Sequence, residues 1–226
     1  AAADASAQHW FDAARVLTEN AGGYFQGIGD LDGDGDPDLV SLTGYSSFYF
    51  DGWRVYTNDG TGQFSSGPTT SFPAGFEVTA FHPNLADVTG DGRLDLVLRA
   101  RTTVTPIAYG LAVLEGLPGG QFGSFGFHAL SGPVTDADFG DIDGDPAREI
   151  AVTHQVSGTN QDDLVRWLDW TGSGFSQSTA LLIPQVNPSL EGVAEVAAFD
   201  FSGDGVADIA TASYYGSLLR RCVTVA

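Results

Sequence analysis

The stretch Asp30-Leu-Asp32-Gly-Asp34-Gly-Asp36-Pro-Asp38 places an acidic side chain at every second position of a nine-residue loop. Oxygen ligands at positions 1, 3, 5 and 9, with a backbone carbonyl at position 7, can surround Ca²⁺, which takes roughly six to eight oxygens. Glycine at position 6 (Gly35) supplies the positive φ that turns the chain back around the ion. The stretch therefore predicts a calcium-binding loop.

The same loop recurs three more times along the chain. Its copies begin at Asp87, Asp141 and Asp200, so successive first aspartates lie 57, 54 and 59 residues apart. From Asp200 through the C-terminus and round to Asp30 takes 56 residues, so the repeat fills the chain. Four matched copies indicate a repeat architecture more strongly than unrelated Asp/Gly-rich turns. The predicted ligands, with position 7 contributing its carbonyl, are Asp30, Asp32, Asp34, Asp36, Asp38, Asp87, Thr89, Asp91, Arg93, Asp95, Asp141, Asp143, Asp145, Ala147, Glu149, Asp200, Ser202, Asp204, Val206 and Asp208.

The third loop departs from the pattern. It carries Pro146 at position 6, whose φ is fixed near −65°, and the longer Glu149 at position 9, so we expect its geometry to differ. An EF-hand is a competing calcium site, but it requires a bidentate glutamate at position 12 and flanking helices. Position 12 is occupied by Ser41, Leu98, Val152 and Thr211. The sequence excludes an EF-hand.

Short, β-branched-rich runs flank every loop. Residues 39–42 and 150–153 are examples after a loop, and residues 24–28 and 193–199 are examples before one. Such runs predict strands, and two more follow in each unit. Four strands per unit of about 57 residues is the pattern of a propeller blade. We therefore expect an all-β fold, a small propeller of four four-stranded blades, with the calcium loop between strands 1 and 2 of each blade.

The fourth unit lacks its last strand. Residues 8–17 resemble the start of that strand elsewhere, since Trp10 precedes Asp30 by 20 residues as Phe122 precedes Asp141 by 19. We expect residues 1–20 to complete the last blade, which would close the ring and remove an open sheet edge. The whole chain, 1–226, is then one propeller domain.

The loop-plus-strand motif, Gly29-Asp30-Leu-Asp-Gly-Asp-Gly followed by Asp38-Leu-Val, resembles the FG-GAP/VCBS repeats. Such repeats build the propellers of integrin α chains and of certain fungal and bacterial lectins, and those propellers usually have seven blades. Four repeats imply either a small four-bladed ring or an incomplete chain whose partner supplies the rest. The even spacing favours the small ring.

The composition fits an extracellular protein. The formal charge is −20, with nine arginines and no lysine, and 15 of the 29 acidic residues lie in the four loops. Four Ca²⁺ ions would reduce the net charge to −12 and relieve self-repulsion. A chain without a basic patch has no counterion-release route to nucleic acid, and no apolar stretch is long enough for a membrane span. We therefore expect neither nucleic acid binding nor insertion into a membrane. The chain begins with Ala1 and contains no methionine, as expected of a mature secreted protein after signal-peptide cleavage.

Catalytic motifs are missing from the sequence. There is no Gly-x-Ser-x-Gly elbow, no His-Glu-x-x-His, no glycine-rich phosphate loop and no Cys/His zinc spacing. Most acidic residues already belong to the predicted loops. We therefore expect a binding protein and not an enzyme.

The predicted ligand surface lies opposite the calcium loops, where the connections between strands 2 and 3 are long and unlike one another. Aromatic rings beside polar and charged groups suit recognition of a sugar or of a protein. The predicted ligand residues are Tyr45, Tyr49, Arg99, Arg101, Tyr109, His154, Tyr214 and Tyr215.

Three functions remain open. The first is a carbohydrate-binding module in which calcium is structural, as the lectin resemblance implies. The second is an adhesion or assembly module that binds an extracellular protein, which the divergence of these connections favours. The third is a polysaccharide lyase using Arg101, Tyr109 or His154 on a uronic acid. The glycan, the protein ligand and a homo-oligomeric state are not specified by the sequence.

Overall fold

The computed structural model describes residues 24–79, 85–145, 147–155, 163–179, 181–182, 191–215 and 219–225. Within these ranges the chain forms strands and no helix, so the all-β prediction is confirmed. No helix in the described part is long and apolar enough to cross a membrane.

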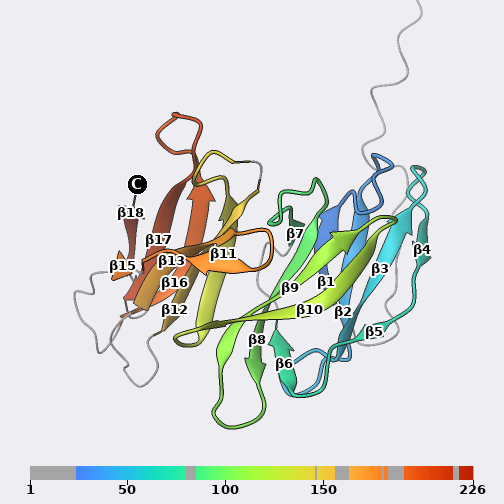
Figure 1. Ribbon diagram of the computed structural model, residues 1–226, viewed down its shortest axis with the longest axis horizontal. Helices are drawn as coiled ribbons and strands as arrows, with labels where there is room; N and C mark the ends of the chain where they lie inside the picture. Colours follow the sequence, from blue (N-terminus) through green and yellow to red (C-terminus); the bar gives the residue numbers. More distant parts are fainter. Residues whose placement is uncertain are drawn as a thin grey trace, which may run out of the picture.

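The strands form four antiparallel sheets that follow one another along the sequence (Figure 1). Sheet 1 contains β1 (Tyr24–Gly29), β2 (Asp38–Thr43), β3 (Gly52–Asn58), β4 (Phe64–Ser66) and β5 (Thr70–Ser71). Sheet 2 contains β6 (Phe76–Thr79), β7 (Leu85–Ala86), β8 (Asp95–Thr102), β9 (Tyr109–Leu117) and β10 (Gln121–Leu130). Sheet 3 contains β11 (Val134–Gly140), β12 (Glu149–Gln155), β13 (Asp163–Trp170), β14 (Phe175–Gln177) and β15 (Leu181–Leu182). Sheet 4 contains β16 (Glu191–Phe199), β17 (Asp208–Tyr215) and β18 (Leu219–Val225).

Each sheet is a meander with four strand positions, except sheet 4. Two short strands share one position in three sheets: β4 and β5 both pair with β3, β6 and β7 with β8, and β14 and β15 with β13. Sheet 4 shows three strands in the described part of the chain. Its predicted fourth strand, from residues 1–20, lies outside the described residues.

The four acidic loops occupy equivalent places. Each joins the first strand position of its sheet to the second, as predicted, and the loops run over residues 30–38, 87–95, 141–149 and 200–208. In sheets 1 and 2, where it is described, the connection between the second and third strands lies at the other end of the sheet. Any ligand site built from those connections is therefore separated from the loops by the length of a strand.

Successive sheets pack face to face. Side chains that alternate along β8 fill two different cores: Leu96 and Leu98 pack toward sheet 1, whereas Val97 packs toward sheet 3. All three are fully buried. A third core joins sheets 3 and 4 through Ala151, Val165 and Ile209. Because strands 2 and 3 of the middle sheets are apolar on both faces, these sheets need a neighbour on each side. This stack of antiparallel sheets is a β-propeller-like fold; Figure 1 shows sheets 1 and 2 on the right and sheets 3 and 4 on the left.

Candidate metal loops and ligand pocket

The first aspartate of each loop holds the turn through its carboxylate. In loop 1 (residues 30–38), Asp30 accepts hydrogen bonds from the backbone N–H groups of Gly33 (2.8 Å) and Gly35 (3.0 Å). Loops 2 (87–95) and 4 (200–208) repeat both bonds at the same positions. In loop 3 (141–149) the N–H of Gly144 donates to Asp141 at 2.6 Å, but Pro146 at position 6 has no N–H to donate. The expected departure of loop 3 is thus the loss of one such bond.

The ninth residue of each loop is the anchor to the sheet. Asp38 accepts a hydrogen bond from the N–H of Leu31 at 2.9 Å and another from the N–H of Asn58 on β3 at 2.8 Å. Asp95 makes the equivalent bonds to Val88 (2.9 Å) and to Gly116 (2.7 Å). Asp38, Asp95 and Glu149 are all 0% exposed. The position 9 carboxylates therefore hold both the loop and the adjacent strands.

Burial makes the charge on these carboxylates unfavourable. Desolvation raises the pKa of Asp95 to about 6, although hydrogen bonds from Gly116 and Val88 oppose it. Desolvation also raises the pKa of Glu149 to about 7, with the backbone bond from Ile142 acting in the opposite direction. A cation held beside such a buried carboxylate would favour its charged form.

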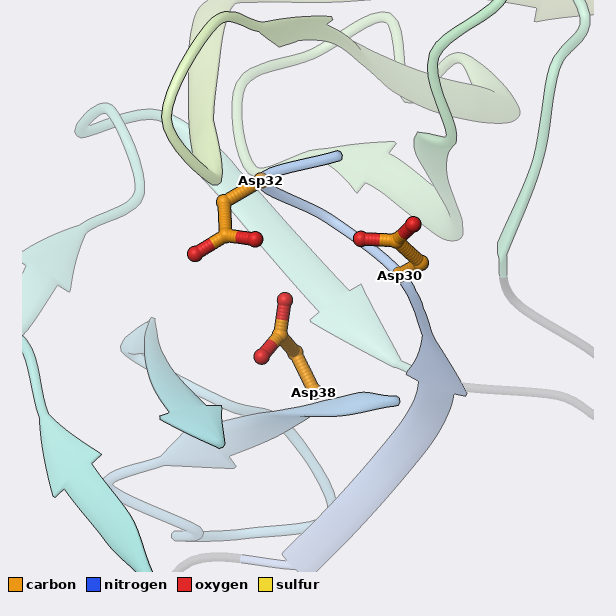
Figure 2. A group of neighbouring side chains, drawn as sticks. All are labelled: Asp30, Asp32 and Asp38. Carbon is orange, nitrogen blue, oxygen red and sulfur yellow. The ribbon is translucent and has the colours of Figure 1, made fainter. Parts of the chain in front are cut away.

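The oxygens of loops 1 and 3 converge as metal binding requires. In loop 1, oxygens of Asp30, Asp32 and Asp38 lie within 4.8 Å of one another, and Figure 2 shows the three carboxylates directed toward a common space. In loop 3, oxygens of Asp141, Asp143 and Glu149 lie equally close. The second oxygen of Glu149, Oε1, is buried and has no hydrogen-bond partner in the described structure. A buried carboxylate oxygen without a donor is the environment that a hard cation fits.

Loops 2 and 4 have a different ligand chemistry at position 3, where Thr89 and Ser202 replace aspartate. Asp87 and Asp200 still take the bonds expected of position 1. Arg93, predicted to contribute its position 7 carbonyl, directs its side chain onto Asp91 and, through Nε, onto the carbonyl of Gly116 at 2.8 Å. The metal assignment of all four loops remains a prediction, with geometry that suits it best in loops 1 and 3.

Four of the predicted ligand residues meet in one pocket at the opposite end of the strands. Tyr49 from the β2–β3 connection, Arg99 and Arg101 from β8, and Tyr109 from β9 line a pocket of about 170 Å³. Glu77 of β6 lines it as well. Pro133 and Val134, at the start of β11 in sheet 3, complete the lining. The pocket therefore combines residues of sheets 2 and 3 with the β2–β3 connection of sheet 1.

Arg101 is the centre of this pocket. Its Nε donates to Glu77 Oε2 at 2.5 Å, and its Cζ lies 5.2 Å from the centroid of the Tyr49 ring. The bond to Glu77 raises the pKa of Arg101. Burial lowers the pKa of Arg99, whose Nη1 donates to the carbonyl of Thr135 at 3.0 Å. Sequence reasoning did not place Glu77 here, although the signal is simple: Glu77 and Arg101 are direct cross-strand partners.

The other predicted ligand residues lie apart from the pocket. Tyr45 packs its ring against Tyr24 (5.3 Å between centroids) and Phe50 (5.0 Å). His154 is a correction: it is 0% exposed, with Nδ1 3.4 Å from the hydroxyl of Ser131, so its ring does not face a surface ligand. The backbones of Tyr214 and Tyr215 belong to β17, and their side chains lie outside the described part.

The antiparallel sheets and the repeated acidic loops define a β-propeller-like repeat protein. The sequence model of the FG-GAP-like repeat matches residues 30–98 and 141–211, which together make up more than half of the 226 residues. The chain therefore belongs to the FG-GAP-like repeat family, as the motif predicted. No curated protein matches it.

Proposed function

We propose that this chain is a secreted, calcium-stabilised propeller of four blades that binds carbohydrate in the pocket around Arg101. The observation that carries the proposal is the composition of that pocket: Tyr49 and Tyr109 stand beside the Arg101–Glu77 pair. Aromatic faces pack against the C–H groups of a sugar, while a guanidinium and a carboxylate bind its hydroxyls. A binding role also fits the family, whose repeats form binding modules.

The size of the pocket limits what enters it. Pockets for drug-sized ligands measure roughly 300–1,000 Å³, and this one is about 170 Å³. We infer that the pocket holds one sugar residue of a longer glycan. The rest of the glycan would then cross the surrounding surface.

Calcium acts at a distance in this proposal. Asp95 of loop 2 begins β8 and Arg101 lies six residues further along the same strand. At about 3.3 Å per residue, the two are separated by about 20 Å. The cation would thus stabilise the sheet that presents the pocket without contacting the ligand.

A protein ligand is the alternative, and one observation favours it. Phe48, next to Tyr49, is 78% exposed and has a φ of 76°, unusual for a residue with a side chain. An exposed ring in such a turn suits a protein interface. A lyase is a weaker alternative, because Arg101 and Tyr109 share the pocket but His154 is buried elsewhere.

A glycan array tests the proposal with calcium-loaded protein and an EDTA-treated sample. We expect selective binding that Tyr49→Ala and Arg101→Gln reduce at least tenfold. Arg54→Gln is the matched control, since Arg54 bonds Thr69 outside the pocket at 3.1 Å. A blank array from folded, calcium-loaded protein would overturn the carbohydrate proposal in favour of a protein ligand. New unsaturated ends on a linear uronate polymer would instead identify a lyase.

A further inference from the structure

We propose that Asp169, a residue of β13 outside the repeat motif, is an additional ligand for a divalent cation in loop 3. The inference rests on the calcium role proposed for the loops and concerns a residue that the repeat pattern does not include. It makes loop 3, whose proline departs from the pattern, a site with a ligand set of its own.

The side chains of loop 3 and β13 converge. Oxygens of Asp143, Asp145 and Asp169 lie within 4.8 Å of one another, and Asp143 also belongs to the group with Asp141 and Glu149. The strand register explains this. Leu168 pairs with Ile150 in the antiparallel β12–β13 ladder, and both pack toward sheet 2. Asp169, one residue after Leu168, and Glu149, one residue before Ile150, therefore share the opposite face. Five carboxylates therefore surround one loop.

These carboxylates accept hydrogen bonds from backbone N–H groups but have no positively charged side chain beside them in the described structure. No arginine side chain pairs with any of the five in the described structure, and the only donor to Asp169 there is the hydroxyl of Ser176 at 3.4 Å. Glu149 is fully buried, and its Oε1 has no hydrogen-bond partner among the residues described. A bound cation would satisfy that oxygen and the surrounding negative charge together.

Loops 1 and 2 do not offer the same arrangement. The position equivalent to Asp169 is Thr57 in sheet 1 and Glu115 in sheet 2, one residue beyond the pairs Leu39–Tyr56 and Leu96–Leu114. Glu115 is exposed and joins no acidic group in the described part of the chain. In loop 2, Asp91 is also paired with Arg93, whereas position 7 of loop 3 is Ala147. Among the first three loops, the added ligand is thus particular to loop 3.

Terbium luminescence provides a local readout. Tb³⁺ occupies oxygen-ligand calcium sites, and Trp167 and Trp170 lie two residues and one residue from Asp169, where they can sensitise its emission. Glu149→Gln first identifies the part of the signal that belongs to loop 3. Calorimetric titration with Ca²⁺ then gives the affinity of the native ion.

We expect Asp169→Asn to weaken the loop 3 affinity about tenfold in both titrations. Asp169→Glu, which keeps the charge, should stay within about threefold of the unmodified protein, and Glu115→Gln, the matched control in sheet 2, should leave it unchanged. Far-UV circular dichroism checks that each variant folds, and if Asp169→Asn does not, Asp169→Ser replaces it.

Two results would overturn the inference. Equal affinities of the unmodified protein and Asp169→Asn would remove Asp169 from the site. A terbium signal unaffected by Glu149→Gln would remove the cation from loop 3 altogether. Neither result tests the proposed calcium binding of the other loops. That binding is tested separately by comparing the melting temperature in calcium and in EDTA.

Discussion

Mutations in loop 1 should affect stability differently at Asp38 (position 9) than at Asp32 and Asp34 (positions 3 and 5). Only Asp38 is also part of the sheet, because it begins β2. Asp38→Ala removes the acceptor for the N–H groups of Leu31 and Asn58, the first of them buried. Leaving a buried donor unsatisfied costs about 1–3 kcal/mol. We therefore expect Asp38→Ala to lose about 1–3 kcal/mol of unfolding free energy even in EDTA from the buried N–H of Leu31, and a smaller amount from the part-buried N–H of Asn58.

The double variant Asp32→Ala/Asp34→Ala should behave in the opposite way. Its lost bonds, to the N–H groups of Asp34 (3.2 Å) and Asp36 (2.9 Å), are solvent-exposed, so water replaces them. We expect a change below about 1 kcal/mol in EDTA. With free calcium at about 100 times the dissociation constant, the unmodified loop gains about 2.7 kcal/mol, which this variant loses.

Urea denaturation followed by circular dichroism, in calcium and in EDTA, separates the two effects. Asp38→Asn, which keeps one acceptor oxygen, should fall between the unmodified protein and Asp38→Ala. Two outcomes would refute the reasoning: Asp38→Ala as stable as the unmodified protein in EDTA, or the double variant as stable as the unmodified protein in calcium.

Three further predictions concern contacts between sheets. A Cβ on Gly140 would lie 2.7 Å from that of Ala207 and 2.9 Å from that of Ala198, so Gly140→Val should cost about 1–3 kcal/mol; an unchanged melting temperature would contradict this. Asp138 accepts a hydrogen bond from the N–H of Ala198 at 2.9 Å, and Asp138→Ala should cost about 1–3 kcal/mol in urea denaturation, equally in calcium and EDTA. Burial lowers the pKa of His128, so the unfolded chain binds more protons below the ordinary value of 6.5, and stability falls as pH drops through that range. His128→Gln should flatten this slope in melting curves between pH 7 and 5; identical slopes would show that His128 is not responsible.

The strands and loops could be predicted because their signals are local and repeated. Alternation along residues 96–98 assigns one face to each neighbouring sheet, and the aspartate at position 1 explains each turn without reference to the rest of the chain. The same reasoning predicted Tyr49, Arg99, Arg101 and Tyr109 as ligand residues from their positions at strand ends, and the structure brings them together.

Contacts between paired strands of one sheet could not be predicted in the same way. Asp169 joins loop 3 only through the pairing of β12 with β13, and Glu77 reaches Arg101 only through the pairing of β6 with β8. The prediction of His154 as a ligand residue was wrong for a related reason. His154 lies at the end of an apolar run, and packing, not the sequence pattern, decides on which side of the strand its ring lies. A strand end can therefore be located from sequence more readily than the direction of its side chains.

Backbone bonds also join loop 3 to loop 2 and loop 4 to loop 3. The N–H of Arg148, at position 8 of loop 3, donates to the carbonyl of Asp87, at position 1 of loop 2, at 2.9 Å. Ala207 of loop 4 makes the same bond to Asp141 of loop 3 at 2.6 Å. Because these contacts use main-chain atoms at fixed loop positions, the junction depends little on which side chains a repeat carries. A repeat with these loop positions therefore carries the main-chain groups for its own junction, and duplication of a gene segment encoding such a repeat would copy them along with it.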